Sequence, residues 1–125
     1  IEKRNKIAKY YDNLFCDKNL FKTPKVKKNV YHSYHLYPLL VNLKKIRKSK
    51  KQIFNEFLKN KINLQVHYIP INTQPYYKKK YGFKKNSFKN SLEFYNKEIS
   101  MPIYYDLTYK QLNYIKKVNK KIFNF

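Results

Sequence analysis

Two polar side chains alternate along the stretch LQVHYIP, residues 64–70. Gln65 carries an amide that can donate and accept hydrogen bonds, and His67 carries an imidazole that can donate, accept or hold a proton. Alternation of apolar and polar residues predicts a strand over 64–69 that ends at Pro70, with Leu64, Val66 and Tyr68 on its packed face. Gln65 and His67 would then point the same way, either towards one ligand or as a satisfied pair on an edge strand.

The other reactive residues lack the spacing of a catalytic or metal site. His32 and His35 lie three residues apart, but no further cysteine or histidine completes a zinc motif. We therefore expect no metal, with His32 solvated in a loop and His35 a hydrogen-bonded structural residue. One glycine cannot build a phosphate-binding loop, and the few acidic residues, including Glu93 and Glu98, fall on expected helix surfaces. The chain by itself therefore contains no complete catalytic apparatus.

The chain is strongly basic, with 29 Lys and Arg against 7 Asp and Glu and a net charge of +22. Such a charge is typical of proteins that bind polyanions. Nearly all of it is lysine, however, and the accompanying Asn, Ile, Tyr and Phe share A/T-rich codons, so base composition is a competing explanation. In the segment KKKYGFKKNSFK, residues 78–89, lysines alternate with aromatic residues. The aromatic rings could stack on the bases of RNA or DNA. Its alternative is a solvated loop anchored by buried aromatic side chains.

Length and cysteine content limit the class of protein. The 125 residues suffice for one domain with an aromatic-rich core. Cys16 is the only cysteine, which excludes an intrachain disulfide and favours a reducing, cytoplasmic compartment. No apolar run approaches the roughly 18 residues of a membrane helix. Because the sequence starts at Ile1, inside a helical pattern, we expect a larger N-terminal portion to precede it.

The spacing of apolar residues predicts an order of elements. Capping boxes at Ser49–Gln52 and Thr108–Gln111 mark two helix starts. The full expectation is a helix over 1–17, a strand over 35–43, a helix from 49 to about 60, the strand 64–69, a loop over 70–90, a short helix carrying Leu92, Tyr95 and Ile99, a short strand from Met101, and a terminal helix. This order indicates an α/β fold of the two-layer α+β kind, a small sheet with helices packed on one face.

Four segments carry a resemblance to a known family. They are KRNKIAKYYDNLF (3–15), HLYPLLV (35–41), QVHYIPINTQPYY (65–77) and EFYNKEISMPIYYDLTYKQLNYI (93–115). In order and spacing they resemble the C-terminal small domain of pyridoxal-phosphate-dependent nucleotide-sugar aminotransferases, the DegT/StrS family, and within it the transaminases of pseudaminic acid biosynthesis. The resemblance implies that residues 1–125 form the small domain of a fold-type I transferase, with 1–17 as its connecting helix. The large cofactor-binding domain would lie outside this chain.

The resemblance also implies an activity. The full-length enzyme would be a cytoplasmic homodimer that passes an amino group from an amino acid, with glutamate expected, to a UDP-linked 4-keto-6-deoxy sugar. Pyridoxal 5'-phosphate would be held mainly by the missing domain, which would also supply the Schiff-base lysine, so no catalytic residue is expected here. Carried over by position, the substrate-binding residues are Gln65, Val66, His67 and Tyr68. Asn72, where relatives commonly have histidine, is a weaker candidate.

Overall fold

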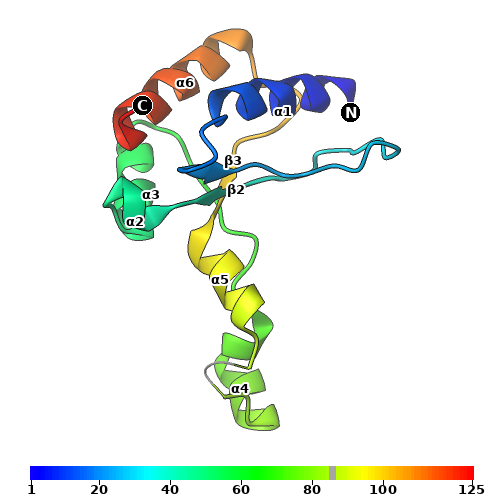
Figure 1. Ribbon diagram of the computed structural model, residues 1–125, viewed down its shortest axis with the longest axis vertical. Coiled ribbons are helices and arrows are strands. Elements are labelled where there is room, and N and C mark those ends of the chain that lie inside the picture. The colour runs from blue at the N-terminus through cyan, green and yellow to red at the C-terminus, as the bar shows by residue number, and fades with distance from the viewer. Residues whose placement is uncertain (85–86) are drawn as a thin grey trace.

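A small antiparallel sheet lies at the centre of the molecule, as the computed structural model shows (Figure 1). The structure describes residues 1–84 and 87–125. The elements in chain order are α1 (Glu2–Leu14), β1 (Phe21–Lys22), β2 (Tyr37–Val41), α2 (Leu43–Ile46), α3 (Lys50–Lys59), the 3-10 helix η1 (Ile71–Thr73), α4 (Pro75–Tyr81), α5 (Lys89–Lys97), β3 (Glu98–Met101) and α6 (Tyr109–Phe123). Within this described part, β2 is the middle strand between β1 and β3.

The register of β2 and β3 separates the two faces of the sheet. Tyr37 lies opposite Met101 and Leu39 opposite Ile99, and all four side chains are buried. Because side chains alternate along a strand, Glu98 and Ser100 leave β3 on the other face. The sheet therefore has one apolar face and one face on which β3 carries polar groups.

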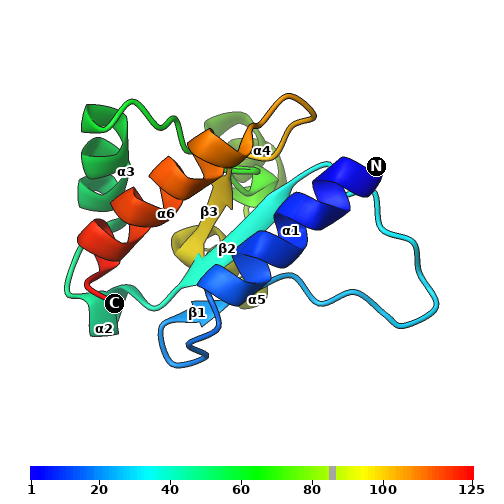
Figure 2. The same cartoon turned by 90° about the horizontal axis from the view of Figure 1, so that it is seen from above.

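Helices α1 and α6 lie across the apolar face of the sheet, as Figure 2 shows. Both present buried side chains at three- and four-residue spacing, which matches the period of a helix. In α6 these are Leu112, Ile115, Val118 and Ile122, and in α1 they are Ile7, Tyr11 and Leu14. The expected small sheet with helices packed on one face is confirmed.

Aromatic rings fill much of the space between these helices and the sheet. The ring centroids of Tyr11 and Tyr37 are 5.0 Å apart, and those of Phe21 and Phe123 are 5.2 Å apart. The buried phenols keep hydrogen-bond partners: Tyr11 donates to the carbonyl of Pro102 at 2.7 Å and Tyr37 to Asp12 Oδ1 at 2.6 Å. Burial, and then the hydrogen bond to Asp12, raise the pKa of Tyr37 well above its ordinary value. Both phenols therefore act as neutral core residues.

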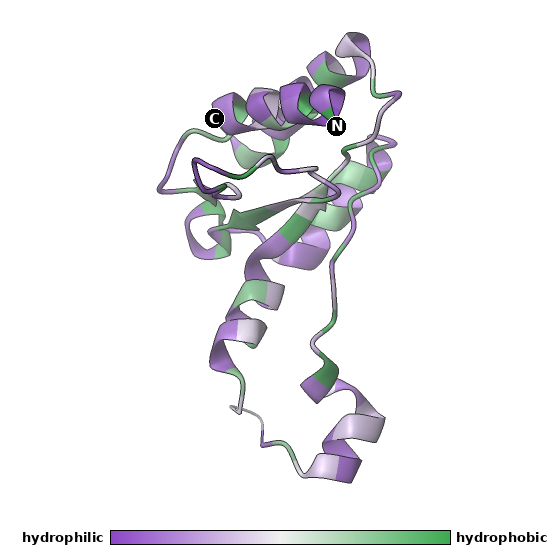
Figure 3. Cartoon of the chain, turned by 90° about the vertical axis from the view of Figure 1, so that its right-hand side faces the viewer, coloured by the Kyte–Doolittle hydropathy of each residue, from purple (hydrophilic) through white to green (hydrophobic). Residues whose placement is uncertain are grey.

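Helices α4 and α5 form an arm that extends away from the covered face of the sheet (Figures 1 and 3). The prediction of a loop over 70–90 is wrong, since η1 and α4 lie within it. Pro75 occupies the first turn of α4, where its missing N–H costs nothing, and Gly82 ends that helix with φ at 61°. Pro75 and Gly82 therefore mark the two ends of α4, a helix whose sequence has no apolar stripe.

Several predicted boundaries also shift. The short helix was expected to reach Ile99, but α5 ends at Lys97 and Ile99 belongs to β3. The short strand was expected to begin at Met101, which is instead its last residue. The two-residue β1 and the four-residue α2 have too few residues to show a period, and the sequence did not predict them.

Both predicted capping boxes are present, with reciprocal hydrogen bonds at Ser49–Gln52 and Thr108–Gln111. We expect Ser49→Ala to lower the free energy of unfolding by about 1 kcal/mol, because the Gln52 N–H loses its acceptor at the start of α3. Chemical denaturation of the variant would measure this. Ser49→Asp, which restores a side-chain acceptor, should recover most of the loss; equal destabilisation by both variants would contradict the role of the cap.

Candidate functional site

Gln65 joins the sheet through a single antiparallel bridge to Ser100 in β3. Ser100 N–H donates to the Gln65 carbonyl at 2.8 Å, and Gln65 N–H donates to the Ser100 carbonyl at 3.4 Å. The predicted strand over 64–69 is otherwise wrong, because the ladder does not continue beyond this pair. The backbone N–H of His67 donates instead to the carboxylate of Glu98, with 3.3 Å between N and Oε2. The backbone N–H of Glu98 does not pair with this segment either, because it donates to the Phe94 carbonyl at the end of α5.

Loss of the ladder changes where the side chains lie. Leu64 is buried as expected, but Val66 is only half-buried and Tyr68 is 73% exposed, so the predicted packed face of Val66 and Tyr68 is wrong. Gln65 is exposed, and His67 is half-buried. The peptide bond between His67 and Tyr68 is cis, and their rings meet edge to face with centroids 4.8 Å apart. Residues 65–68 therefore form a surface segment that joins β3 through one backbone bridge at Gln65 and through the contacts of His67 with Glu98 and Ser100.

The imidazole of His67 ends a chain of three side chains. Its Nδ1 lies 2.7 Å from Ser100 Oγ, and Ser100 Oγ donates to Glu98 Oε1 at 2.5 Å. Ser100 is 4% exposed and Glu98 is fully buried. Both come from the polar face of β3, which is turned away from α1 and α6. A buried carboxylate therefore reaches a half-buried imidazole through one serine.

Glu98 and Ser100 were not predicted as parts of this site. The apolar spacing of Leu92, Tyr95 and Ile99 continued a helical pattern and placed Glu98 on a solvated helix surface. The available signal was the alternation in EISM, residues 98–101, where two polar residues alternate with two apolar ones. That pattern is typical of a strand with two different faces.

Lys50 at the start of α3 lies near the same carboxylate. Its Nζ donates to the carbonyl of Tyr95 at 2.6 Å and sits 4.7 Å from the centre of the Tyr95 ring. Burial lowers the pKa of Lys50, and the negative charge of Glu98 opposes that shift. The ammonium group thus gives partial electrostatic compensation to the buried carboxylate.

The remaining histidines and the cysteine stay apart from this site. His32 is exposed, and its Nδ1 accepts a hydrogen bond from the Tyr34 N–H at 3.1 Å. His35 is exposed and precedes β2, so the expectation that it is a structural residue at the head of the strand is wrong. Cys16 is exposed too. Among the described residues, no group of three or more potential metal ligands lies together.

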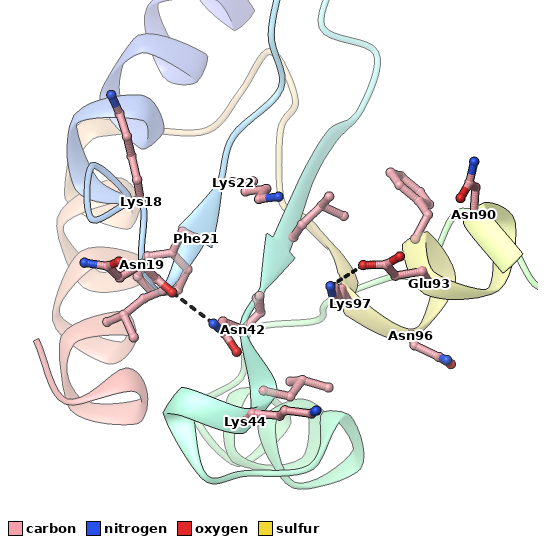
Figure 4. A pocket seen from close by; sticks show the side chains of 15 residues that line it. Lys18, Asn19, Phe21, Lys22, Asn42, Lys44, Asn90, Glu93, Asn96 and Lys97 are labelled. Carbon is pink, nitrogen blue, oxygen red and sulfur yellow. Dashed lines mark hydrogen bonds and ion pairs between the residues drawn. The ribbon is translucent and has the colours of Figure 1, made fainter.

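Two cavities in the described part of the chain do not include residues 65–68. One has a volume of about 660 Å³ and lies between β1, β2 and α5 (Figure 4). Its wall combines apolar side chains such as Leu40 and Phe94 with lysines such as Lys22 and Lys97. The other, of about 610 Å³, is lined by Asn72, which is 9% exposed, and by residues of α4 and α5. Asn72 therefore lines a cavity to which residues 65–68 do not contribute.

The basic segment 78–89 is partly outside the described residues, at 85 and 86. In the described part, Tyr81 is 56% exposed and Phe88 45% exposed, so the expectation of buried anchoring aromatics is wrong. The rings instead contact one another: Phe83 stacks on Tyr81 with centroids 5.5 Å apart and meets Phe88 at 5.3 Å.

Across the part of the chain that the structure covers, no helix has the length and apolar character to cross a bilayer.

Pyridoxal phosphate does not fit the described groups around His67. The cofactor would need a free amine, a carboxylate for its ring nitrogen and a cradle for its phosphate. The oxygens of Glu98 already accept from Ser100 and His67, and the amine of Lys50 is bonded to the Tyr95 carbonyl. Gly82, the only glycine, ends α4 in the arm and opens no phosphate cradle. The exposed amide of Gln65, the imidazole of His67 and the ring of Tyr68 fit a polar ligand better.

Comparisons with known proteins agree on one family. Residues 1–119 match the DegT/DnrJ/EryC1/StrS aminotransferase family. An uncharacterised protein of Methanocaldococcus jannaschii is 37% identical over 97% of this chain and 31% of its own length. UDP-4-amino-4,6-dideoxy-N-acetyl-beta-L-altrosamine transaminase of Campylobacter jejuni is 34% identical over 93% of this chain and 30% of its own length. The chain thus spans about a third of the length of these relatives.

A solved structure extends the similarity to the fold. Helicobacter pylori PseC, described as an aminotransferase involved in the biosynthesis of pseudoaminic acid, aligns with a TM-score of 0.85 and 32% identity. The alignment covers 98% of this chain and 32% of PseC. The order and packing of helices and strands described above therefore match those of one part of PseC.

Proposed function

The chain belongs to the DegT/DnrJ/EryC1/StrS aminotransferase family, and from this membership we propose that the whole protein is a sugar aminotransferase. Its acceptor would be a UDP-linked 4-keto-6-deoxy sugar and its amino donor glutamate. The observation that carries the proposal is the similarity, along 93% of the chain, to a transaminase whose name specifies a UDP-linked amino sugar. In keeping with the family resemblance, we further propose that the protein acts in the cytoplasm as a homodimer.

The role of this chain would be to bind the sugar nucleotide through residues 65–68. The side chains of Gln65 and His67 can exchange hydrogen bonds with sugar hydroxyl or diphosphate oxygens. The exposed ring of Tyr68 offers an apolar surface for a sugar or a base. Pyridoxal phosphate, bound by the rest of the protein, would carry the amino group between the two substrates. Residues 65–68 would orient the acceptor, and Asn72 would be a secondary determinant of which sugar fits.

The proposal predicts a measurable conversion by the full-length protein. With pyridoxal phosphate, glutamate and a UDP-linked 4-keto-6-deoxy-N-acetylhexosamine, we expect mass spectrometry to detect the 4-amino sugar nucleotide together with 2-oxoglutarate. The amine moves from glutamate to C4 of the sugar, so the two products should appear in equal amounts. A protein that shows the cofactor's absorbance but converts no UDP-4-keto sugar would contradict the assigned substrate class.

The basic composition requires a separate test of the nucleic-acid alternative. Exposed Tyr81 and Phe88 beside lysines would support stacking on single-stranded RNA or DNA. In that case, oligonucleotide binding should be tight at low salt and fall steeply as salt rises. We expect only weak, non-saturating binding from the full-length protein. Tight binding with a steep salt dependence, without aminotransferase activity, would favour the alternative.

A further inference from the structure

The hydrogen bonds that connect Glu98, Ser100 and His67 can run in one direction only. The backbone N–H of His67 can only donate, and it donates to Glu98 Oε2. The other oxygen of Glu98 accepts from the hydroxyl of Ser100. A serine hydroxyl has one proton, so once Ser100 donates to Glu98 its oxygen can only accept from His67. The short contact between Ser100 Oγ and His67 Nδ1 therefore requires a proton on Nδ1.

The groups around Glu98 suit a hydrogen-bond acceptor at the start of these three side chains. Both of its oxygens face donors, and the ammonium group of Lys50 interacts with it through the electric field. Within the described residues, Nδ1 is the ring nitrogen of His67 that has a partner, and the edge-to-face contact with Tyr68 supports the ring from a second side. Nε2 is thus left for a ligand.

We propose that Glu98 and Ser100 are positioning residues that hold His67 as its Nδ1–H tautomer and present Nε2 to the nucleotide sugar. The ligand named in this inference rests on the proposed function, whereas the tautomer of His67 does not depend on it. A neutral His67 would accept a hydrogen bond from a sugar hydroxyl through Nε2, and a protonated one would donate to a phosphate oxygen. Glu98 and Ser100 act only through His67.

The direction of donation makes Glu98→Gln an informative variant of nearly the same shape. The amide oxygen of glutamine can accept from the His67 N–H, but its NH2 group then faces Ser100 and must donate. The Ser100 hydroxyl would turn and donate to His67 Nδ1, which leaves the proton on Nε2. With the amide rotated the other way, two donors would meet at the His67 N–H. The substitution should therefore move the ring proton from Nδ1 to Nε2.

The test uses the full-length protein labelled with 15N-histidine, in mildly alkaline buffer where histidines are generally neutral. Long-range proton–nitrogen spectra distinguish the two tautomers, and His67→Gln identifies the signal. We expect Nδ1–H in the parent protein, Nε2–H in Glu98→Gln, and a mixture in Ser100→Ala. Ser100→Thr, which keeps the hydroxyl, should retain Nδ1–H. Titration with UDP-N-acetylglucosamine, a non-reacting nucleotide sugar, should give about tenfold weaker binding for Glu98→Gln.

The ring signal and the affinity separate the two proposals. Nε2–H in the parent protein, or an unchanged tautomer in both Glu98→Gln and Ser100→Ala, would overturn the positioning role. A tautomer that changes as expected with unaltered affinity would uphold control of the ring by Glu98 and overturn the contact between His67 and the substrate. A loss of affinity in Ser100→Ala that Ser100→Thr restores would support both.

Discussion

Replacing His67 with alanine is expected to raise the KM for the nucleotide sugar about 10- to 100-fold in the full-length protein while the cofactor's absorbance stays intact. The change removes a hydrogen-bonding group of the substrate site, and hydrogen bonds to charged ligands contribute about 1.5–3 kcal/mol. The fold should persist, because the backbone N–H of residue 67 can still donate to Glu98 and the Ser100–Glu98 hydrogen bond does not involve the ring. Steady-state kinetics with the sugar nucleotide varied at saturating glutamate would measure the effect.

A matched control comes from the same residue type in another part of the chain. His35 is exposed and lies before β2, so His35→Ala should leave both KM values unchanged. The KM for glutamate in His67→Ala is a second control, since the proposal assigns His67 to the sugar nucleotide. Loss of the cofactor's absorbance in His67→Ala would count against the substrate role, as would an unaltered KM for the sugar.

Local signals in the sequence predicted the helices of the core well. The capping boxes at Ser49 and Thr108 depend on residues three positions apart, and the stripe of α6 depends on a period of one helix turn. Such features are decided within the element itself. The strand at residues 64–69 depends on a partner more than thirty residues away, and that partner supplies only one rung, through Ser100. Alternation in the strand's own sequence could not reveal this.

The candidate site was predicted only in part for the same reason. The polarity of Gln65 and His67 left ligand binding and a satisfied edge-strand pair both open, the family resemblance favoured ligand binding, and that assignment remains a prediction. Burial of Glu98 was missed because LEFYNKEI fits a helical stripe, and that stripe outweighed the alternation in EISM at β3. At Glu98 the N–H makes the last helical hydrogen bond, to Phe94, the backbone turns extended with ψ at 132°, and the carboxylate binds His67 and Ser100. Tertiary hydrogen bonds thus overrode the local period.

Phe57→Ala is expected to produce the largest loss of stability, about 3–5 kcal/mol, because it opens a cavity of aromatic size in the core. Phe57 is fully buried on α3, and its ring centroid lies 5.8 Å from that of Phe123 on α6. These two helices pack together, and α6 in turn covers the sheet that carries Ser100. Native-state hydrogen exchange on the full-length protein would measure the effect in peptides from both helices.

The neighbouring Leu58→Ala provides the control, since Leu58 is on the same helix but 63% exposed. A substitution at such a surface position should change stability by no more than about 0.5 kcal/mol. Because α6 covers the sheet to which β3 belongs, Phe57→Ala should also weaken exchange protection at Ser100, whereas Ser49→Ala should act mainly at the first turn of α3. Protection that falls in α3 alone, with α6 and β3 unchanged, would mean that Phe57 does not connect α3 to the sheet carrying the site.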